Sequence, residues 1–439
     1  MQDMLITVVD FGSKKLSASL GKRTGTEVEI IASQNVPSKG GIKKGIVEDV
    51  NICKDSLGEV LKKLEWLSGE KVDGVYAGIS SKNIKTTEAD GEIYLKNGSV
   101  REEDKKNVIE DAKKKLSLAE EEEIVDTLVN FYTLDGRIIE KEINNSLGNN
   151  LKVNITFVLG LKNELDKYRK IVKEAGYEFN GFVVNIIGGK NIFLYDDKSM
   201  GTHAIVDVGA EITDIAVFNN GILKYISSVP LGGENITKDL SICGKYSLVE
   251  SENLKNIYSK NYESMYNDTT TDDIIEVGST KVSKELFYEV IQARLEEIIK
   301  YINLEIKKTS FYEGICSIII YGDGLVNYEN VTSIVNSNIE KKCKVVTKAE
   351  LGMKSLADIS SLADVKEVYD RLSLIDEDKI EIEKSKEEYN NNYVEEFNNE
   401  YEEDEEPKGF IQKIKKFLMG KDWRRSYFVR FWSWYARIN

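Results

Sequence analysis

One short pattern occurs twice in this sequence: an apolar run that ends in Asp-x-Gly, followed by a polar turn and a second apolar run. The first copy is LITVVDFGSKKLSASLG, with Asp10 at the end of its first run, and the second is AIVDVGAEITDIAVFNNG, with Asp207 at the same place. Apolar runs on either side of a polar bend are typical of a β-hairpin. The two aspartates lie 197 positions apart, too long a period for a solenoid. The pattern therefore predicts a duplicated domain whose copies face one another across a cleft.

Length and composition agree with several α/β subdomains and exclude some functions. A chain of 439 residues exceeds what a single hydrophobic core usually supports. The net charge of −15 argues against nucleic acid as a partner, because phosphate backbones call for a basic surface. A single histidine, His203, leaves a zinc site or a Ser-His-Asp triad without its usual residues.

Predicted strands and helices alternate along most of the chain, and their arrangement changes after residue 83. Residues 84–162 contain four predicted strands and one highly charged helix, which indicates an inserted α+β subdomain within an α/β chain. The expected division is a first subdomain over 1–83 and 163–200, the inserted subdomain over 84–162, a second subdomain over 201–230 and 300–365, and a smaller one over 231–299.

The composition changes again near the C-terminus. Residues 366–406 are expected to form a disordered acidic linker, because residues 380–406 carry twelve Asp or Glu against two Lys. Residues 407–439 carry nine Lys or Arg and one Asp, with an apolar stripe opposite the lysines. A basic amphipathic helix on a long tether is typical of a membrane-surface anchor, and the alternative is a terminal helix docked on the body or on a partner. Whether residues 421–439 form a second anchor stays open.

The repeated hairpins have the chemistry of a phosphate site. An aspartate at each strand end can orient Mg²⁺ through water, while glycine and small hydroxyl residues let backbone N–H groups approach phosphate oxygens. One Asp-x-Gly also begins ordinary turns, but two copies favour phosphate. Two further segments support this interpretation: Gly232-Gly233, which precedes a predicted helix, and Gly322-Asp323-Gly324, which follows a buried strand.

Three polar features near these hairpins each allow a functional or a purely structural role. A phosphate contact by Lys14 or Lys15 and a solvated turn are equal alternatives. Glu211 could position an attacking water, or it could be an exposed hairpin residue. The glycine-rich loop over residues 39–45 is interpreted as a connection to the helix that follows it.

Several segments together resemble the FtsA family of actin-like bacterial cell division proteins, over essentially the whole chain. The segments, in family order, are VVDFGSKKL, PSKGGIKKGIVEDV, VYAGISSKNI, AIVDVGAEITDIAVFNNG, VPLGGENITKDL and IIIYGDGLV, followed by the acidic linker and the amphipathic end. The resemblance implies an actin-like ATPase fold of duplicated ribonuclease-H-like subdomains, with an inserted subdomain in place of actin's usual one.

The resemblance also implies ATP and Mg²⁺ as cofactors, with slow or vestigial hydrolysis, and it assigns site residues by position. The first phosphate loop would be Asp10, Gly12, Ser13 and Lys14, the second Asp207, Gly209, Ala210, Glu211 and Thr213, with Gly233 near the phosphates, Glu252 and Lys255 near adenosine, and Gly322 and Gly324 beside the base. Asp10 and Asp207 would hold Mg²⁺ through water, and Asp207 and Glu211 would be catalytic. This chain departs from the superfamily at Ser13, where many members have Thr, and at Ala210 and Glu211, which replace two glycines of a three-glycine run.

The implied partners are further copies of the chain, the C-terminal peptide of the tubulin-like FtsZ, the anionic membrane surface and later division proteins. The smaller subdomain over 231–299 would bind the partner peptide, and the location would be the cytoplasmic face of the membrane at the division site. Two alternatives share the fold. A pilus or secretion adaptor usually lacks the acidic tether and terminal helix, and a sugar or metabolite kinase would need a base for the acceptor hydroxyl that no segment here offers.

Overall fold

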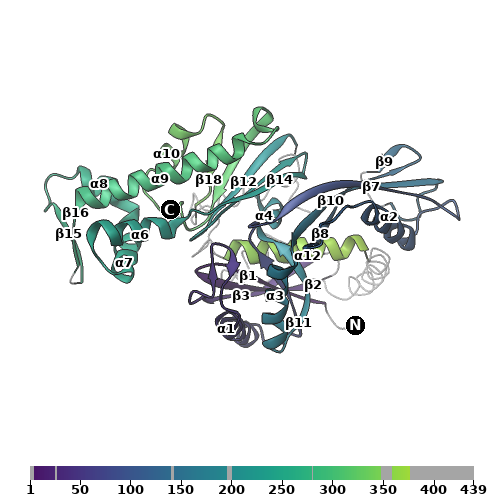
Figure 1. Ribbon diagram of the computed structural model, residues 1–439, viewed down its shortest axis with the longest axis horizontal. Coiled ribbons are helices and arrows are strands. Elements are labelled where there is room, and N and C mark those ends of the chain that lie inside the picture. Colours follow the sequence, from purple (N-terminus) through teal and green to yellow (C-terminus); the bar gives the residue numbers. More distant parts are fainter. Residues whose placement is uncertain are drawn as a thin grey trace, which may run out of the picture.

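The computed structural model describes residues 4–24, 27–139, 143–194, 200–278, 280–347 and 358–375. Figure 1 shows an elongated molecule in which two large sheets lie near the centre and smaller subdomains lie at the two ends. The acidic linker predicted beyond residue 375 and the amphipathic segment 407–439 lie outside the described residues.

The first large sheet contains the first hairpin, in the order β11-β6-β1-β2-β3. Strands β1 and β2 pair antiparallel, and β6 lies parallel to β1 on its other side. The helices α1 and α3 pack against each other, and α1 covers β2 and β3. The elements of this subdomain are β1 (Leu5–Phe11), β2 (Lys15–Thr24), β3 (Glu27–Pro37), β4 (Ile42–Lys43), β5 (Ile46–Val47), α1 (Val50–Ser68), β6 (Gly74–Ile79), α3 (Lys162–Glu174), β11 (Glu178–Val184), α4 (Asn185–Gly188) and α5 (Lys190–Phe193).

The second large sheet repeats this topology, in the order β14-β13-β12-β17-β18. Its hairpin strands β12 and β13 pair antiparallel, and β17 lies parallel to β12. Asn220 and Gly221 between β13 and β14 have φ of 49° and 77°, as a tight hairpin turn requires. The duplication predicted from the two hairpins is therefore confirmed. The strands are β12 (Thr202–Val208), β13 (Thr213–Asn219), β14 (Ile222–Val229), β17 (Ile315–Tyr321) and β18 (Cys343–Val345).

The helical part of the second half extends to the left end of Figure 1. Its longest element, α9 (Lys284–Lys307), buries an apolar stripe of Phe287, Ile291, Leu295 and Ile298. The remaining elements are α6 (Gly233–Gly244), α7 (Leu248–Tyr258), η2 (Ser259–Asn261), α8 (Tyr262–Asn267), β15 (Ile274–Val277), β16 (Thr280–Ser283), η3 (Tyr312–Gly314) and α10 (Val331–Asn338).

The inserted subdomain lies at the opposite end and has a hydrophobic core of its own. Its four strands are ordered β7-β10-β8-β9, and α2 packs on β7 and β10. The expected inserted α+β subdomain is therefore confirmed. Its elements are β7 (Lys85–Tyr94), α2 (Glu102–Lys114), β8 (Glu122–Leu134), β9 (Arg137–Ile139) and β10 (Asn150–Leu161).

The last described helix, α12 (Ile359–Ile375), corrects two expectations. It packs on the first sheet, where Val365 and Val368 are buried against Ile6 and Val8 of β1. Residues 358–365 therefore do not join the second subdomain, and residues 366–375 are not part of a disordered linker. The charged residues Lys366 to Arg371 suggested the start of the linker, but on a helix they alternate with a buried apolar stripe.

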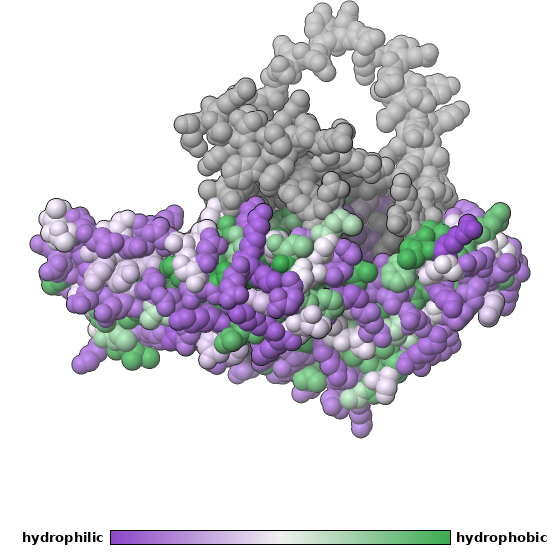
Figure 2. Space-filling view, turned by 90° about the horizontal axis from the view of Figure 1, so that it is seen from above, coloured by the Kyte–Doolittle hydropathy of each residue, from purple (hydrophilic) through white to green (hydrophobic). Residues whose placement is uncertain are grey.

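The surface seen from above is mostly hydrophilic, with small separate groups of apolar side chains (Figure 2). Within the described ranges, none of the helices is both long enough and apolar enough to span a bilayer.

Candidate functional site

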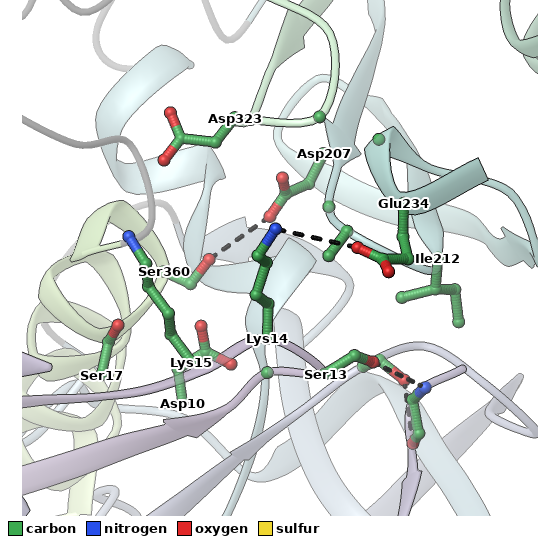
Figure 3. A pocket seen from close by; sticks show the side chains of 18 of the residues that line it. Asp10, Ser13, Lys14, Lys15, Ser17, Asp207, Ile212, Glu234, Asp323 and Ser360 are labelled. Atoms are coloured by element: carbon green, nitrogen blue, oxygen red, sulfur yellow. Dashed lines mark hydrogen bonds and ion pairs between the residues drawn. The ribbon is translucent and has the colours of Figure 1, made fainter. Parts of the chain in front are cut away.

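A cavity of about 410 Å³ lies between the two halves of the molecule and is lined by both hairpins. Figure 3 shows side chains from both halves converging on it. The predicted residues that line it are Asp10, Gly12, Ser13, Lys14, Asp207, Gly209, Ala210, Gly233, Glu252, Lys255, Gly322 and Gly324.

Strand register explains why the two aspartates meet at this cavity. Asp10 lies beside Gly78 of the parallel strand β6, and Asp207 lies beside Tyr321 of the parallel strand β17. Both residues are near the carboxyl ends of their strands, where ligands bind in open α/β sheets. The same topology repeated twice thus brings one carboxylate from each sheet to the same crevice.

Asp10 and Asp207 are half-buried, and they lie among like charges that include the buried Asp214. Burial raises the pKa of Asp10 to about 7, although Asn185 Nδ2 donates to its Oδ1 over 2.6 Å and acts in the other direction. Burial, with the charges of Asp214 and Asp10, raises the pKa of Asp207 well above its usual range. Burial raises the pKa of Asp214 to about 6 despite hydrogen bonds from Ser81. A divalent cation would offset both the cost of keeping these carboxylates ionised away from water and the repulsion between them. This set of carboxylates therefore suits a divalent cation.

Lys14 crosses the cavity from the first half to the second. Its Nζ ion-pairs with Glu252 and lies 3.7 Å from Glu234 Oε2. Lys255, three residues after Glu252 on α7, places its Nζ 2.7 Å from Glu252 Oε2 and 2.6 Å from Thr237 Oγ1. Burial alone would raise the pKa of Glu252, but Lys255 and Lys14 outweigh it and hold that pKa at about 2. Glu252 is therefore a carboxylate between two cations.

Glycines allow three backbone segments to meet at the second aspartate. Gly322 has a φ of +104°, and a Cβ there would lie 2.4 Å from Val208 O and 2.5 Å from Asp207 Oδ1. A Cβ on Gly324 would lie 2.1 Å from Gly209 O. The space above Asp207 thus depends on the absence of side chains at both positions.

Gly233 lies at the start of α6, where an anion site is expected, but its N–H donates to Gly209 O over 3.0 Å. The next N–H, of Glu234, donates to Ala210 O over 2.7 Å. These two donors therefore tie α6 to the second hairpin and are not directed at a phosphate in this structure.

Two predicted residues do not line the cavity. Thr213 is fully buried, and its hydroxyl donates to Leu231 O over 2.8 Å. Glu211 accepts from Lys44 N over 2.9 Å and lies 3.1 Å from Lys238 Nζ. Neither Ala210 nor Glu211 has a positive φ, so replacing two glycines here introduces no backbone strain.

The glycine-rich loop is more than a connection. Gly45 lines the cavity, and its N–H lies 3.4 Å from Ser13 Oγ. Its φ is +74°, and a Cβ there would lie 2.2 Å from Ser80 Oγ. The close approach between this loop, Ser13 and Ser80 needs a glycine. The repeated glycines at 40, 41 and 45 were the sequence feature that could have indicated this close approach.

Several other lining residues were not assigned from sequence. Asp214 is opposite Asp207 in the β12–β13 register, so the hairpin pattern contained the information that places it. Asn185 begins α4 and Ser360 lies in the first turn of α12. Both come from distant segments, and no local motif marks them.

Magnesium and a nucleotide fit this residue set. Among the described residues, no group of three or more His, Cys, Asp or Glu could hold a metal ion. Mg²⁺ usually keeps several waters and takes one or two carboxylates together with substrate phosphates, so it does not require such a group. Asp10 and Asp207, on opposite sides of the cavity, suit that kind of binding.

Comparison with known proteins agrees with the fold and with the segments quoted above. A family model for "Cell division protein FtsA" matches residues 204–392, and one for "SHS2 domain inserted in FTSA" matches residues 81–159. Cell division protein FtsA of Bacillus subtilis (strain 168) is 28% identical over 359 residues, which is 80% of each chain. The FtsA of Neisseria meningitidis serogroup B is 25% identical over 315 residues, 71% of this chain and 75% of that protein.

A solved structure shows the same fold at lower identity. A chain of the PilM-PilN type IV pilus biogenesis complex is 13% identical, with a TM-score of 0.56 over 83% of this chain and 98% of that chain. That likeness concerns the fold alone, whereas two family models and the curated relatives name one family. The chain therefore belongs to the FtsA family of bacterial cell division proteins, and it has an actin-like fold with an inserted SHS2 domain.

Proposed function

We propose that this chain binds ATP with Mg²⁺ in the cavity, polymerises with copies of itself, and tethers FtsZ to the cytoplasmic membrane at the division site through residues 407–439. The observation that carries the nucleotide part is the pair of related hairpins that face one another across one cavity, each contributing a half-buried aspartate. Family membership supports the division role.

Each side of the cavity has a role in this proposal. Asp10 and Asp207 would hold Mg²⁺ through water, and the bound cation would neutralise charge on the phosphates. Ser13 and Lys14 would contact phosphate, since the Lys14 ammonium already lies among carboxylates at the centre of the cavity. The nucleoside would lie toward Glu252 and Lys255, on the side that Gly322 and Gly324 keep open.

Hydrolysis would be slow or vestigial. The glutamate assigned as catalytic, Glu211, is held by Lys44 N and Lys238 Nζ and does not line the cavity. A group that orients water must be within hydrogen-bond reach of it in the reacting complex. Glu211 would have to exchange both partners before it could act, which favours nucleotide binding over rapid turnover.

The membrane and partner parts rest on the family and on sequence. The acidic segment 380–406 separates the folded body from the basic segment 407–439. Electrostatic attraction between such a basic amphipathic segment and anionic lipid would hold the protein at the surface. The subdomain over 231–299 would take the FtsZ C-terminal peptide, and later division proteins would bind the assembled protein. The pilus-adaptor alternative has only the fold-level likeness in its favour.

The nucleotide proposal is tested by calorimetry. Asp207→Ala should weaken Mg-ATP binding by at least about tenfold, since it removes a charged group worth more than about 1.4 kcal/mol. The matched control is Asp73→Ala, because that side chain is 79% exposed and distant from the lining residues. Equal affinity in wild type and Asp207→Ala would contradict the proposal.

The tethering proposal needs two further experiments. A chain that ends at Glu406 should remain folded and should no longer float with anionic liposomes, whereas the full chain floats with anionic but not with neutral liposomes. A pull-down with an FtsZ C-terminal peptide separates the division tether from a pilus adaptor. Flotation of the truncated chain would contradict the membrane anchor. Failure to retain the peptide would contradict the tethering of FtsZ.

A further inference from the structure

Helix α12 begins at the cavity. Ser360, in its first turn, places its Oγ 3.4 Å from Asp207 Oδ2, as the dashed line in Figure 3 shows. The next residue, Ser361, is fully buried and lies 2.8 Å, Oγ to Oγ, from Ser19 of β2. The start of α12 therefore contacts the aspartate of the second half and the hairpin of the first half together.

The middle of α12 packs closely on the short helix α4, whose first residue donates a hydrogen bond to the other aspartate, Asp10. Asp364 is fully buried, and a Cβ on Gly188 of α4 would lie 2.2 Å from Asp364 Oδ1. Asn185, at the start of α4, donates to Asp10. Two helices in contact this close cannot shift independently, because a packed interior has no free volume for such movement. A displacement of α12 would therefore move the helix that orients Asp10.

The far end of α12 is joined to the inserted subdomain. Glu367 is 2% exposed and binds Lys190 and Asn191 of α5, at 3.1 and 2.9 Å. One turn later, Arg371 places Nη2 2.7 Å from Oδ2 of Asp126 on β8, which is 7% exposed. This contact is an ion pair without hydrogen-bond geometry, and Asp126 Oδ1 separately accepts Thr127 N.

We propose that α12 couples the occupancy of the cavity to the position of the inserted subdomain, with the Arg371–Asp126 ion pair as the joint. The inference rests on the proposed function, since it requires Mg-ATP in the cavity. Mg-ATP would bind with different affinity to the position of α12 seen here and to a displaced one, because Asp207 Oδ2 faces Ser360 in this structure and would also face the water of a bound cation. A differential contact of this kind is what allows a ligand to shift a conformational equilibrium.

Other ion pairs also link the inserted subdomain to the rest of the molecule and provide competing routes; one joins Arg169 of α3 to Glu123 of β8. Lys224 of β14 lies 2.5 Å from Glu88 of β7. Glu88 is 43% exposed, so solvent screens this pair and its loss has little effect. Loss of one partner from the buried Arg371–Asp126 pair leaves an uncompensated charge, which makes it the stronger joint.

The test is hydrogen exchange of the full chain with and without Mg-ATP, followed at two segments. Residues 207–213 report binding, and residues 122–134 of β8 report the inserted subdomain. In the wild type, Mg-ATP should slow exchange at both, by about fivefold or more at 122–134, the lower end of ordinary allosteric coupling. Asp126→Asn keeps the Thr127 contact and removes the ion pair. It should retain the effect at 207–213 and lose it at 122–134, whereas the control Glu88→Gln should retain both.

Each other outcome decides against the proposal in a distinguishable way. Slowed exchange at 207–213 but not at 122–134 in the wild type overturns the coupling and leaves nucleotide binding intact. Retention of the effect at 122–134 in Asp126→Asn also overturns it. Slowed exchange at neither segment overturns the proposed nucleotide binding together with the coupling. If Asp126→Asn does not fold, Arg371→Gln replaces it, because it removes the cation that pairs with Asp126; it should likewise retain the effect at 207–213 and lose it at 122–134.

Discussion

Lys14 of the first half and Glu252 of the second half form an ion pair across the cavity, so a single side chain bridges the two related hairpin regions. Glu252 also binds Lys255 and Thr237, which fixes the carboxylate on its own side. Lys14 is 45% exposed and is attached to a turn, so it is the partner that can change position. A phosphate in the cavity would compete with Glu252 and Glu234 for this ammonium.

Replacement of that ammonium should weaken nucleotide binding. Lys14→Met keeps most of the length of the side chain and removes the charge, and a hydrogen bond to a charged group contributes about 1.5 to 3 kcal/mol. Affinity for Mg-ATP, measured by calorimetry, should therefore fall by about tenfold or more. The control is Lys39→Met, which removes an exposed lysine paired with Glu59 outside the cavity. If Lys14→Met bound Mg-ATP as tightly as wild type, Lys14 would be a partner of Glu252 alone.

Gly322 should not accept a side chain. In Gly322→Ala, the new Cβ would collide with Val208 O and Asp207 Oδ1 at a φ that L-residues rarely adopt. We expect a loss of stability of about 1 to 3 kcal/mol from the backbone conformation alone, together with weaker Mg-ATP binding. Gly58 provides the matched control, because it lies inside α1 with open space around it. Gly58→Ala should stabilise the protein by about 0.5 to 1 kcal/mol. Urea denaturation measures both, and equal effects of the two substitutions would contradict the strain argument.

Ser81 should be important for holding the halves together. Its hydroxyl lies 2.6 Å from Asp214 Oδ1 and 2.6 Å from Ser227 O, and its N–H donates to the same carboxylate. Ser81→Ala leaves buried acceptors of the second half without this partner, at a cost of about 1 to 3 kcal/mol. Ser337→Ala is the control, because that exposed hydroxyl only bonds within its own helix. A thermal transition unchanged in Ser81→Ala would show that the contact adds nothing to the interface.

Sequence predicted the parts of this site that are encoded locally. The hairpin at Asp10 and the hairpin at Asp207 follow from alternating apolar runs and polar bends, and the repeat predicted that the two would face each other. Gly322 and Gly324 were identified because a Gly-x-Gly after a fully apolar strand is typical of a buried strand that opens onto a ligand crevice. In each case, a few consecutive residues determine both the backbone conformation and the chemistry.

Residues brought in by tertiary packing could not be predicted in this way. Asn185 and Ser360 reach the cavity from α4 and α12, and neither belongs to a motif. Helix α12 itself was divided wrongly, since Lys366 and Asp370 resemble the acidic segment that follows, while Val365 and Val368 reveal a helix only when the sheet they cover is known. Glu211 was assigned a catalytic role by position, but its contacts with Lys44 and Lys238 depend on two distant segments.

The buried carboxylate of Glu367 should make stability depend on acid pH. Burial alone would raise its pKa, but Lys190 and Arg371 outweigh it and hold that pKa at about 2, below the ordinary value of 4.5. A lowered folded-state pKa contributes stability above the unfolded-state value, and that contribution is lost as pH falls from about 4.5 toward 2.

Glu367→Gln should therefore destabilise the protein by on the order of 3 kcal/mol at pH 7, because it leaves Lys190 and Arg371 without a buried anion. The difference between wild type and variant should shrink as the pH is lowered from 5 to 3, since the unfolded wild-type chain then takes up a proton at this carboxyl while the folded carboxyl stays ionised, and the variant has no such group. Urea denaturation at several pH values measures this difference. Glu59→Gln is the control, because Glu59 pairs with Lys39 and Lys63 at the surface. A Glu367→Gln difference that stays constant between pH 5 and pH 3 would show that folding does not lower the pKa of Glu367.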